Sequence, residues 1–227
     1  MEKSAVLVEV AVESLEAARA AASGGADRIE LCADLNAGGL TPAADLVTRV
    51  LGDVAIPVFP MVRSRGGDFT YSQPEITEMC RTMERLRLLG VHGAVTGTLD
   101  SALKVDVEAM RALLAAAGDM PVTFHRAFDR VADQAAALET LIELGVGRVL
   151  TSGGARTALE GTAQLRALVV QSAGRIAILA GAGVRESNVR AVVAQSGVNE
   201  VHARLIDGPG EVLTVERVQG FVNAARS

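Results

Sequence analysis

Lysine is nearly absent from this sequence of 227 residues, and that scarcity excludes one class of chemistry. The only lysines are Lys3, at the amino terminus, and Lys104, in a predicted loop or helix start. Schiff-base catalysis needs a lysine that lies beside the substrate inside the fold. Neither lysine is in such a place, so a Schiff-base mechanism is not expected.

Cysteines and long apolar runs are also scarce. Cys32 and Cys80 form neither a CxxC pair nor a zinc-binding spacing, and a core-rich chain of this size needs no disulfide. No run of about 18 apolar residues occurs, and the first residues lack the pattern of a secretion signal. The sequence therefore predicts a reduced, cytoplasmic protein that does not span a membrane.

Positive charge is limited as well. The formal net charge is −5 and the sequence pI is about 5.3, whereas nucleic acid and anionic membranes are bound by basic surfaces. We therefore expect neither as a partner. Hydrophobic residues make up 49% of the chain, enough for one large core, so residues 1–227 are interpreted as a single domain.

What the sequence does have is a repeated alternation of short β-branched runs and alanine- and leucine-rich helical runs. Eight runs are predicted as strands: Ala5–Val12, Arg28–Ala33, Val58–Arg63, Gly93–Gly97, Val122–Ala127, Arg148–Ser152, Arg175–Ala180 and Glu200–Leu205. Eight uniform units without a linker favour a closed (β/α)8 barrel of the TIM type. An open doubly wound sheet would be expected to show a GxGxxG motif after its first strand, and none occurs there.

Glycines and caps mark the ends of the predicted helices. Four helical runs end in a glycine shortly before a strand, and glycine suits the left-handed position that ends a helix: Gly25, Gly90, Gly145 and Gly197. Ser72 and Glu75 form a predicted capping box, and Asp106 is a predicted N-cap. Thr41 before Pro42 is interpreted as the N-cap of the second helix.

Side-chain alternation along the strands predicts which polar groups point into the barrel. Glu9, Glu30, His125 and His202 fall on inward faces near strand ends, where barrel enzymes hold their active sites. These groups are predicted to do acid–base work or to bind a divalent ion. The alternative is an internal network in which the carboxylates only pair with Arg63, Arg126 or the histidines.

Several predicted loops at the same end are suited to anions. Arg63 and Arg65 flank a turn that continues through Gly66 and Gly67 to Asp68, and arginines bind carboxylates or phosphates as forked cations. Two further loops, after the sixth and seventh strands, present small residues whose backbone amides can approach an anion: Thr151 and Ser152, and Gly181 and Gly183. Together with Arg126 these residues form the predicted ligand-binding set.

The sequence also resembles the CutC copper-homeostasis family in order over nearly its whole length. The resemblance is carried by GGADRIELC (24–32), GGLTP (38–42), RGGDF (65–69), VTFHRAFD (122–129), VLTSG (149–153) and AGAGV (180–184). It implies a cytoplasmic barrel that is a homodimer or higher homo-oligomer and is linked to copper. The segment 203–210, after His202, is shorter than the corresponding excursion in the family.

The resemblance makes Cys32 a candidate copper ligand, at the family's second cysteine position. The family often has another cysteine in the first strand, where this chain has Ala11. Cu(I) prefers thiolates and thioethers, and Met61 is the one soft neighbour predicted on the inward face. A single inward cysteine is a poor copper chelator, so no cofactor is certain, and Cys80 is expected only to pack.

Three functions follow from these patterns. The first is a copper-homeostasis protein whose polar ligand, a small molecule or copper, is held at the barrel mouth. The second is a lyase, isomerase or hydrolase that uses carboxylate and histidine chemistry on a small phosphorylated or carboxylated compound. The third is a sensing or scaffold role without turnover.

Overall fold

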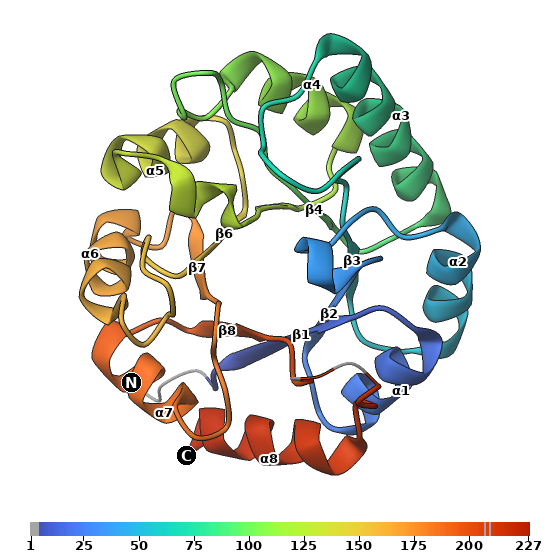
Figure 1. The fold of residues 1–227 in the computed structure, drawn as a ribbon, viewed down its shortest axis with the longest axis vertical. Coiled ribbons are helices and arrows are strands. Elements are labelled where there is room, and N and C mark those ends of the chain that lie inside the picture. The colour runs from blue at the N-terminus through green and yellow to red at the C-terminus, as the bar shows by residue number, and fades with distance from the viewer. Residues whose placement is uncertain (1–4, 207, 209) are drawn as a thin grey trace.

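A computed structural model shows strands and helices alternating along the chain, with the helices in a ring around the strands (Figure 1). It describes residues 5–206, 208 and 210–227, so Lys3, Asp207 and Pro209 lie outside the described residues. Within the described ranges, no helix is long and apolar enough to cross a membrane.

In the part of the chain that the structure describes, eight strands alternate with eight α-helices. The strands are β1 (Leu7–Val12), β2 (Arg28–Leu31), β3 (Val58–Pro60), β4 (Ala94–Thr96), β5 (Val122–Phe124), β6 (Arg148–Thr151), β7 (Ala177–Ala180) and β8 (Glu200–Ala203). The helices are α1 (Leu15–Ser23), α2 (Ala44–Asp53), α3 (Gln73–Leu89), α4 (Val107–Ala117), α5 (Gln134–Glu143), α6 (Thr162–Ser172), α7 (Val189–Ser196) and α8 (Val215–Arg226). Two 3-10 helices, η1 (Leu35–Ala37) and η2 (Arg126–Arg130), follow β2 and β5.

The strands form one parallel sheet in the order β3-β2-β1-β8-β7-β6-β5-β4. Its two edge strands meet through a parallel bridge between Met61 and Val95, and the Val62 amide donates to the Val95 carbonyl at 2.7 Å. The sheet thus closes on itself, and the predicted (β/α)8 barrel is confirmed. Most predicted strands extend beyond the hydrogen-bonded ladder at their carboxyl ends, where the chain turns away to form the mouth.

Two apolar layers lie on the two faces of the sheet. The larger layer packs between strands and helices and includes Val8 and Val10 of β1 and Ile29 and Leu31 of β2. A smaller cluster fills part of the barrel interior and consists of Cys32, Phe59, Met61 and Val95. Alternation along the strands produces both layers, because neighbouring side chains point to opposite faces.

The predicted helix ends are confirmed at all four glycines, whose φ angles lie between 75° and 89°: Gly25, Gly90, Gly145 and Gly197. The Ser72–Glu75 capping box and the Asp106 cap are also confirmed.

Thr41 is not the N-cap of α2, which begins at Ala44 after Ala43. Its hydroxyl instead accepts from the Arg63 amide at 2.9 Å and donates to the Arg63 carbonyl at 3.0 Å. This contact ties the loop after β2 to the loop after β3, so Thr41 helps to position the mouth.

Candidate functional site

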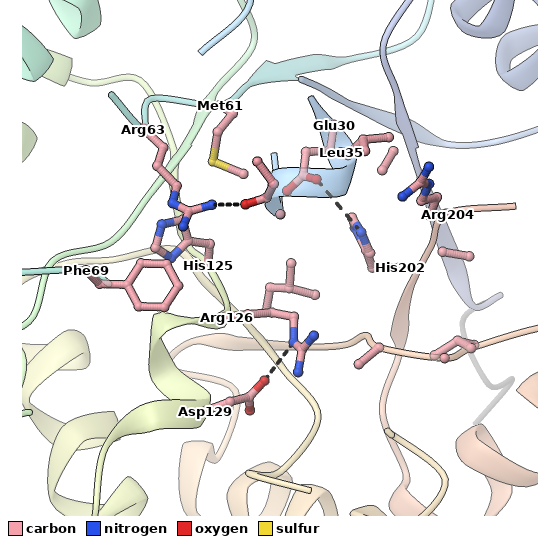
Figure 2. Close-up of a pocket in the computed structure, with 18 of the residues that line it drawn as sticks. Glu30, Leu35, Met61, Arg63, Phe69, His125, Arg126, Asp129, His202 and Arg204 are labelled. Carbon is pink, nitrogen blue, oxygen red and sulfur yellow. Dashed lines mark hydrogen bonds and ion pairs between the residues drawn. The ribbon is translucent and has the colours of Figure 1, made fainter. Parts of the chain in front are cut away.

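A cavity of about 490 Å³ lies at the carboxyl ends of the strands. Its walls come from residues in or just after seven of the strands, including Ala11, Glu30, Met61, Arg63, His125, Leu150, Ala182 and His202. Figure 2 shows Glu30 and His202 facing each other on one side, with Arg63, Phe69 and His125 together on another. The two sides are called here the acidic half (β1, β2 and β8) and the basic half (the segments after β3 and β5).

In the acidic half, strand register places a carboxylate between two cations. Glu9 of β1 is level with Arg28 of β2 and with His202 of β8. The Arg28 guanidinium donates to one Glu9 carboxylate oxygen, and His202 Nδ1 lies 2.7 Å from the other. Burial raises the pKa of Glu9, but the charge of Arg28 and the hydrogen bond with His202 outweigh it and lower the pKa to about 2. Glu9 is therefore an ionised, fully buried member of an ion network.

The same network continues toward the amino ends of the strands. Arg28 also donates to Glu200 at 2.7 Å, and Glu200 is held by Arg148 of β6. Both guanidinium groups lie over the ring of Phe59, at 5.1 Å for Arg28 and 5.7 Å for Arg148. The arginines that neutralise Glu9 and Glu200 therefore come from strand starts, not from Arg63 or Arg126 as the sequence suggested. Arg28 was not predicted, although it lies two residues before Glu30 and so shares its strand face, which is the sequence signal that could have identified it.

Glu30 differs from Glu9 because one of its carboxylate oxygens is unused. Its Oε1 is buried and has no hydrogen-bond partner among the described residues, while Oε2 accepts from the Cys32 thiol at 3.5 Å. His202 Nε2 lies 3.8 Å from Glu30 Oε2. Burial raises the pKa of Glu30, and the facing His202 offsets this only in part. Burial lowers the pKa of His202, but Glu30 and Glu9 outweigh it and raise that pKa.

In the basic half, Arg63 is fixed by its own backbone surroundings. Its Nη1 donates to the carbonyls of Ala37 and Gly39, at 2.9 and 3.2 Å, and its Nη2 to that of Gly67 at 3.1 Å. The guanidinium carbon lies 4.9 Å from the centre of the Phe69 ring. Its Nε is buried without an acceptor in the part of the chain that the structure describes.

His125 is the second fixed group of this half. Its Nδ1 accepts from the Ala127 amide at 3.2 Å, and its Nε2 is buried without a partner among the described residues. Burial lowers the pKa of His125, and the nearby Arg63 charge adds to this, so that the pKa is about 3. At neutral pH the ring is therefore uncharged.

Arg65 and Asp68 do not line the cavity. Arg65 donates to Glu75 at 2.6 Å and to Asp68 at 2.9 Å, and its guanidinium lies over the Tyr71 ring. The two residues therefore stabilise the loop after β3 through contacts that lie away from the cavity. Gly67, between them, is the residue of that turn that borders the cavity.

The loop after β6 holds a carboxylate of the protein itself. Asp129 of η2 accepts hydrogen bonds from the Ser152 amide at 3.0 Å, the Gly154 amide at 3.1 Å and the Thr151 hydroxyl. Arg126 donates to its other oxygen at 2.9 Å. The predicted amide groups do receive an anion, but that anion is Asp129. No role was predicted for Asp129, although it is the last residue of the VTFHRAFD segment (122–129).

The loop after β7 also contains residues with a positive φ, but none of the described carboxylates accepts hydrogen bonds from its amides. Ala182 and Gly183 have φ angles of 79° and 65°, and both border the cavity. Gly181 uses its amide for the Thr151 carbonyl at 3.0 Å, whereas no acceptor is found among the described residues for the amides of Ala182 and Gly183. The loop after the seventh strand therefore has two amides that are unpaired within the described residues, and its binding of an anion stays a prediction.

Three arginines at the cavity were not among the predicted ligand-binding residues: Arg130, Arg185 and Arg204. Arg204 follows β8 and donates to Asn36 at 3.0 Å, which brings the loop after β2 toward β8. Arg130 and Arg126 are exposed on η2. With Arg63, five arginines border a cavity whose only bordering carboxylates, within the described ranges, are Glu30 and Asp129.

The sulfur groups do not fit a Cu(I) chelate. Cys32 is fully buried, and burial together with the charge of Glu30 raises the pKa of its thiol well above the ordinary value of 9.0. Copper binds the thiolate, so binding at Cys32 would have to displace this proton, and a single thiol supplies only one ligand of that kind. Among the described residues, Met61 carries the one sulfur close to it, since both side chains lie next to Gly39. Cys80 packs on α3 against the helical layer.

A group of nitrogen and oxygen ligands is the other candidate for metal. Glu9, Glu30 and His202 offer ligand atoms within 4.8 Å of one another. Both oxygens of Glu9 are already hydrogen-bonded, to Arg28 and to His202. Carboxylate and imidazole ligands suit harder divalent ions rather than Cu(I).

Comparison with known proteins gives matches that cover most of the chain. The model of the CutC family matches residues 6–206. A family protein CutC of Xylella fastidiosa (strain Temecula1) is 47% identical over 196 residues, which cover 86% of this chain and 73% of that one. A copper homeostasis protein cutC homolog of Homo sapiens is 46% identical, with coverages of 86% and 72%. The crystal structure of a copper homeostasis protein CutC from Streptococcus agalactiae is 32% identical, with a TM-score of 0.83 and coverages of 87% and 97%.

Proposed function

The chain belongs to the CutC family, and on that premise we propose that it acts in copper homeostasis by binding a small anion, a phosphate or carboxylate compound, at the barrel mouth. The observation that carries this proposal is the set of five arginines around the cavity. The chain has a net charge of −5, so this concentration of cations is local. A cleft lined by one sign of charge focuses the field and attracts ligands of the opposite sign.

The backbone supports the same ligand. The free amides of Ala182 and Gly183 lie after β7, the usual place for anion binding in barrels of this kind. The loop after β6 shows the compatible chemistry, because it already binds the carboxylate of Asp129. Arg126 lies beside it and is about half exposed, with a side-chain exposure of 46%.

An internal network that merely fills the barrel is the competing explanation. It accounts for Glu9, which is fully paired. It does not account for four buried polar atoms of cavity-lining residues that have no partner among the described residues: Glu30 Oε1, Arg63 Nε, His125 Nε2 and Arg204 Nε. Each such atom costs about 1–3 kcal/mol when it is left unsatisfied, so a network that served only stability would be expected to close them.

Copper itself is not the ligand in this proposal. Because Cys32 offers one buried thiol with only the Met61 thioether beside it among the described residues, we expect the protein to lose Cu(I) completely to a chromophoric chelator, and the Cys32→Ser variant to behave like the wild type. Retention of one Cu(I) per chain, abolished by Cys32→Ser, would show instead that the protein chelates copper directly.

The anion site is tested by titrating inorganic phosphate and ethyl phosphate into the protein in a calorimeter at low ionic strength. We expect saturable binding, and a loss of about fivefold to tenfold in affinity for Arg126→Gln, since each charge-assisted hydrogen bond contributes about 1.5–3 kcal/mol before solvent competition. Arg156→Gln is the matched control, because Arg156 is exposed and does not border the cavity. No binding, or equal binding by the two variants, would refute the site.

Turnover is the second candidate function, and Glu30 favours it. A buried carboxylate with one free oxygen and a histidine 3.8 Å from the other is suited to proton transfer. We propose lyase, isomerase or hydrolase chemistry on the bound anion. Incubation with phosphorylated sugars and oxo acids in D₂O would reveal proton exchange by NMR, and Glu30→Gln should abolish it. Exchange that persists in Glu30→Gln would exclude this role.

Location and assembly complete the proposal. We propose a cytoplasmic homodimer or higher homo-oligomer, with neither nucleic acid nor membrane as a partner. Light scattering on the purified protein and cell fractionation measure the two properties directly. A monomer at all concentrations, or recovery with the membrane fraction, would contradict them.

A further inference from the structure

Two buried N–H groups lie together in the basic half of the mouth: one belongs to Arg63, which is among the five arginines of the proposed anion site, and the other to His125, which is not. They are Arg63 Nε–H and His125 Nε2–H, called here the donor pair. Both side chains border the cavity, and each is at most 4% exposed. Neither nitrogen has a hydrogen-bond partner among the described residues. Both groups contact Phe69, with the Arg63 guanidinium carbon and the His125 ring centre each 4.9 Å from its ring centre.

The contacts of His125 decide which of its nitrogens carries the proton. Nδ1 accepts a hydrogen bond from the Ala127 amide, so it must present a lone pair. A neutral imidazole has one proton, which must therefore be on Nε2. The ring is neutral at physiological pH because burial and Arg63 hold its pKa at about 3. His125 thus presents a donor, and not a metal-binding lone pair, at Nε2.

Both donors are held rigidly before any ligand arrives. The terminal nitrogens of Arg63 bind three carbonyl groups, which fixes the direction of its Nε–H. The His125 ring packs against Gly97, where an added Cβ would lie only 2.6 Å from Nδ1, so even an alanine would displace the ring. Donors fixed in advance bind a developing or full negative charge on oxygen without reorganisation.

We propose that the donor pair is a subsite for one oxygen atom of a carbonyl or carboxylate group on the ligand. This inference rests on the proposed anion site and specifies its ligand: a compound with a phosphate at the rim and an oxo or carboxylate group at its other end. A cation is disfavoured at this position, because the Arg63 guanidinium is adjacent and His125 offers no lone pair there. An apolar ligand end would leave both buried donors unsatisfied, which costs about 1–3 kcal/mol for each.

A pair of probes that differ at one end tests the subsite. Phosphoglycolate carries a carboxylate where ethyl phosphate carries a methyl group. We expect phosphoglycolate to bind the wild-type protein at least about tenfold more tightly, as two well-placed donors would give. The measured quantity is the ratio of the two dissociation constants.

Variants then separate the donor pair from general attraction to charge. His125→Leu should reduce the ratio to within about twofold of unity, whereas His125→Gln, which keeps a terminal N–H donor, should preserve part of it. Arg126→Gln should weaken both probes by the same factor and leave the ratio unchanged. Nitrogen-15 NMR of the wild type provides a readout that needs no variant: phosphoglycolate should shift the His125 Nε2–H signal, and ethyl phosphate should not.

The outcomes distinguish this inference from the proposal on which it rests. If ethyl phosphate binds and phosphoglycolate gains nothing, the subsite is overturned while the anion site stands. A ratio that survives in His125→Leu, or a His125 signal that does not respond to phosphoglycolate, also overturns the subsite. If neither probe binds, the anion site itself is refuted and the subsite falls with it.

Discussion

The acidic and basic halves of the mouth are built from similar residue types but use them differently. In the acidic half, Glu9 lies between Arg28 and His202, and each charge has a partner of opposite sign. In the basic half, Arg63 and His125 are both nitrogen donors, and no carboxylate of the described residues pairs with either one. Consequently the two histidines differ: the pKa of His202 is raised and that of His125 is lowered to about 3.

This difference indicates which half stabilises the barrel and which half is left for a ligand. A closed ion network gives no reason to expect a further partner, because its charges already offset one another. Buried donors without acceptors have a cost that a ligand can remove. Glu30 lies at the boundary between the halves, since it faces His202 but keeps one oxygen free. The predictions below test this contrast.

The largest effect is expected from breaking the acidic half. Arg28→Leu removes the cation that Glu9 and Glu200 share and leaves Glu9 with His202 and Glu200 with Arg148, so the free energy of unfolding should fall by about 3–5 kcal/mol in urea denaturation. Arg19→Leu is the matched control: its pair with Asp53 is largely exposed and should contribute about 1 kcal/mol or less. Equal losses in the two variants would show that the network does not stabilise the barrel.

The basic half should dominate the acid sensitivity of the protein. The unfolded chain protonates His125 below its ordinary pKa of 6.5, whereas the folded chain does so only near 3. Stability therefore falls with decreasing pH in this window, by about 1.4 kcal/mol per pH unit from this group. His125→Gln should reduce the loss of folding stability between pH 6.5 and 5. In this range Glu9, with a pKa of about 2, is still ionised and does not contribute to the loss.

The acidic half should show the opposite dependence. Because the pKa of His202 is raised in the folded state, its stabilising effect is complete below the ordinary value of 6.5 and is lost as pH rises through the raised pKa. His202→Gln should therefore flatten the decline in stability toward alkaline pH, with a smaller effect than His125→Gln has in acid. If stability declines above pH 6.5 to the same extent in His202→Gln and in the wild type, His202 is neutral when it contacts Glu9 and Glu30.

The smallest effect concerns the anion already present at the mouth. Asp129→Asn removes one of two carboxylates at the cavity while keeping an acceptor for the amides of Ser152 and Gly154. Affinity for inorganic phosphate should rise by about threefold, or about 0.6 kcal/mol. Asp133→Asn is the control, because Asp133 caps α5 and does not border the cavity. An unchanged affinity would show that Asp129 does not compete with the ligand.

Much of the fold and part of the site follow directly from the sequence. Period-two alternation separates Glu30 and Cys32 from Ile29 and Leu31, and the structure has them on opposite faces of β2. The helix-ending glycines also follow locally, because few other residues adopt a positive φ. Thr41 shows the limit of such local patterns: it precedes a proline as an N-cap would, but its hydroxyl is used by the backbone of Arg63.

The hydrogen-bond and ion-pair partners of these side chains, by contrast, depend on which strands are neighbours and in what register they pair. The sequence placed Glu9 inside the barrel, but only the pairing of β1 with β2 and β8 puts Arg28 and His202 level with it. In the same way the sequence offered two anion-binding loops, and only the packing of η2 against β6 fills one of them with Asp129. Side-chain direction is a local property of the backbone, so the sequence determined it. The pKa values, the tautomer of His125 and the free donors at the mouth depend on contacts between distant segments, so only the tertiary structure decided them.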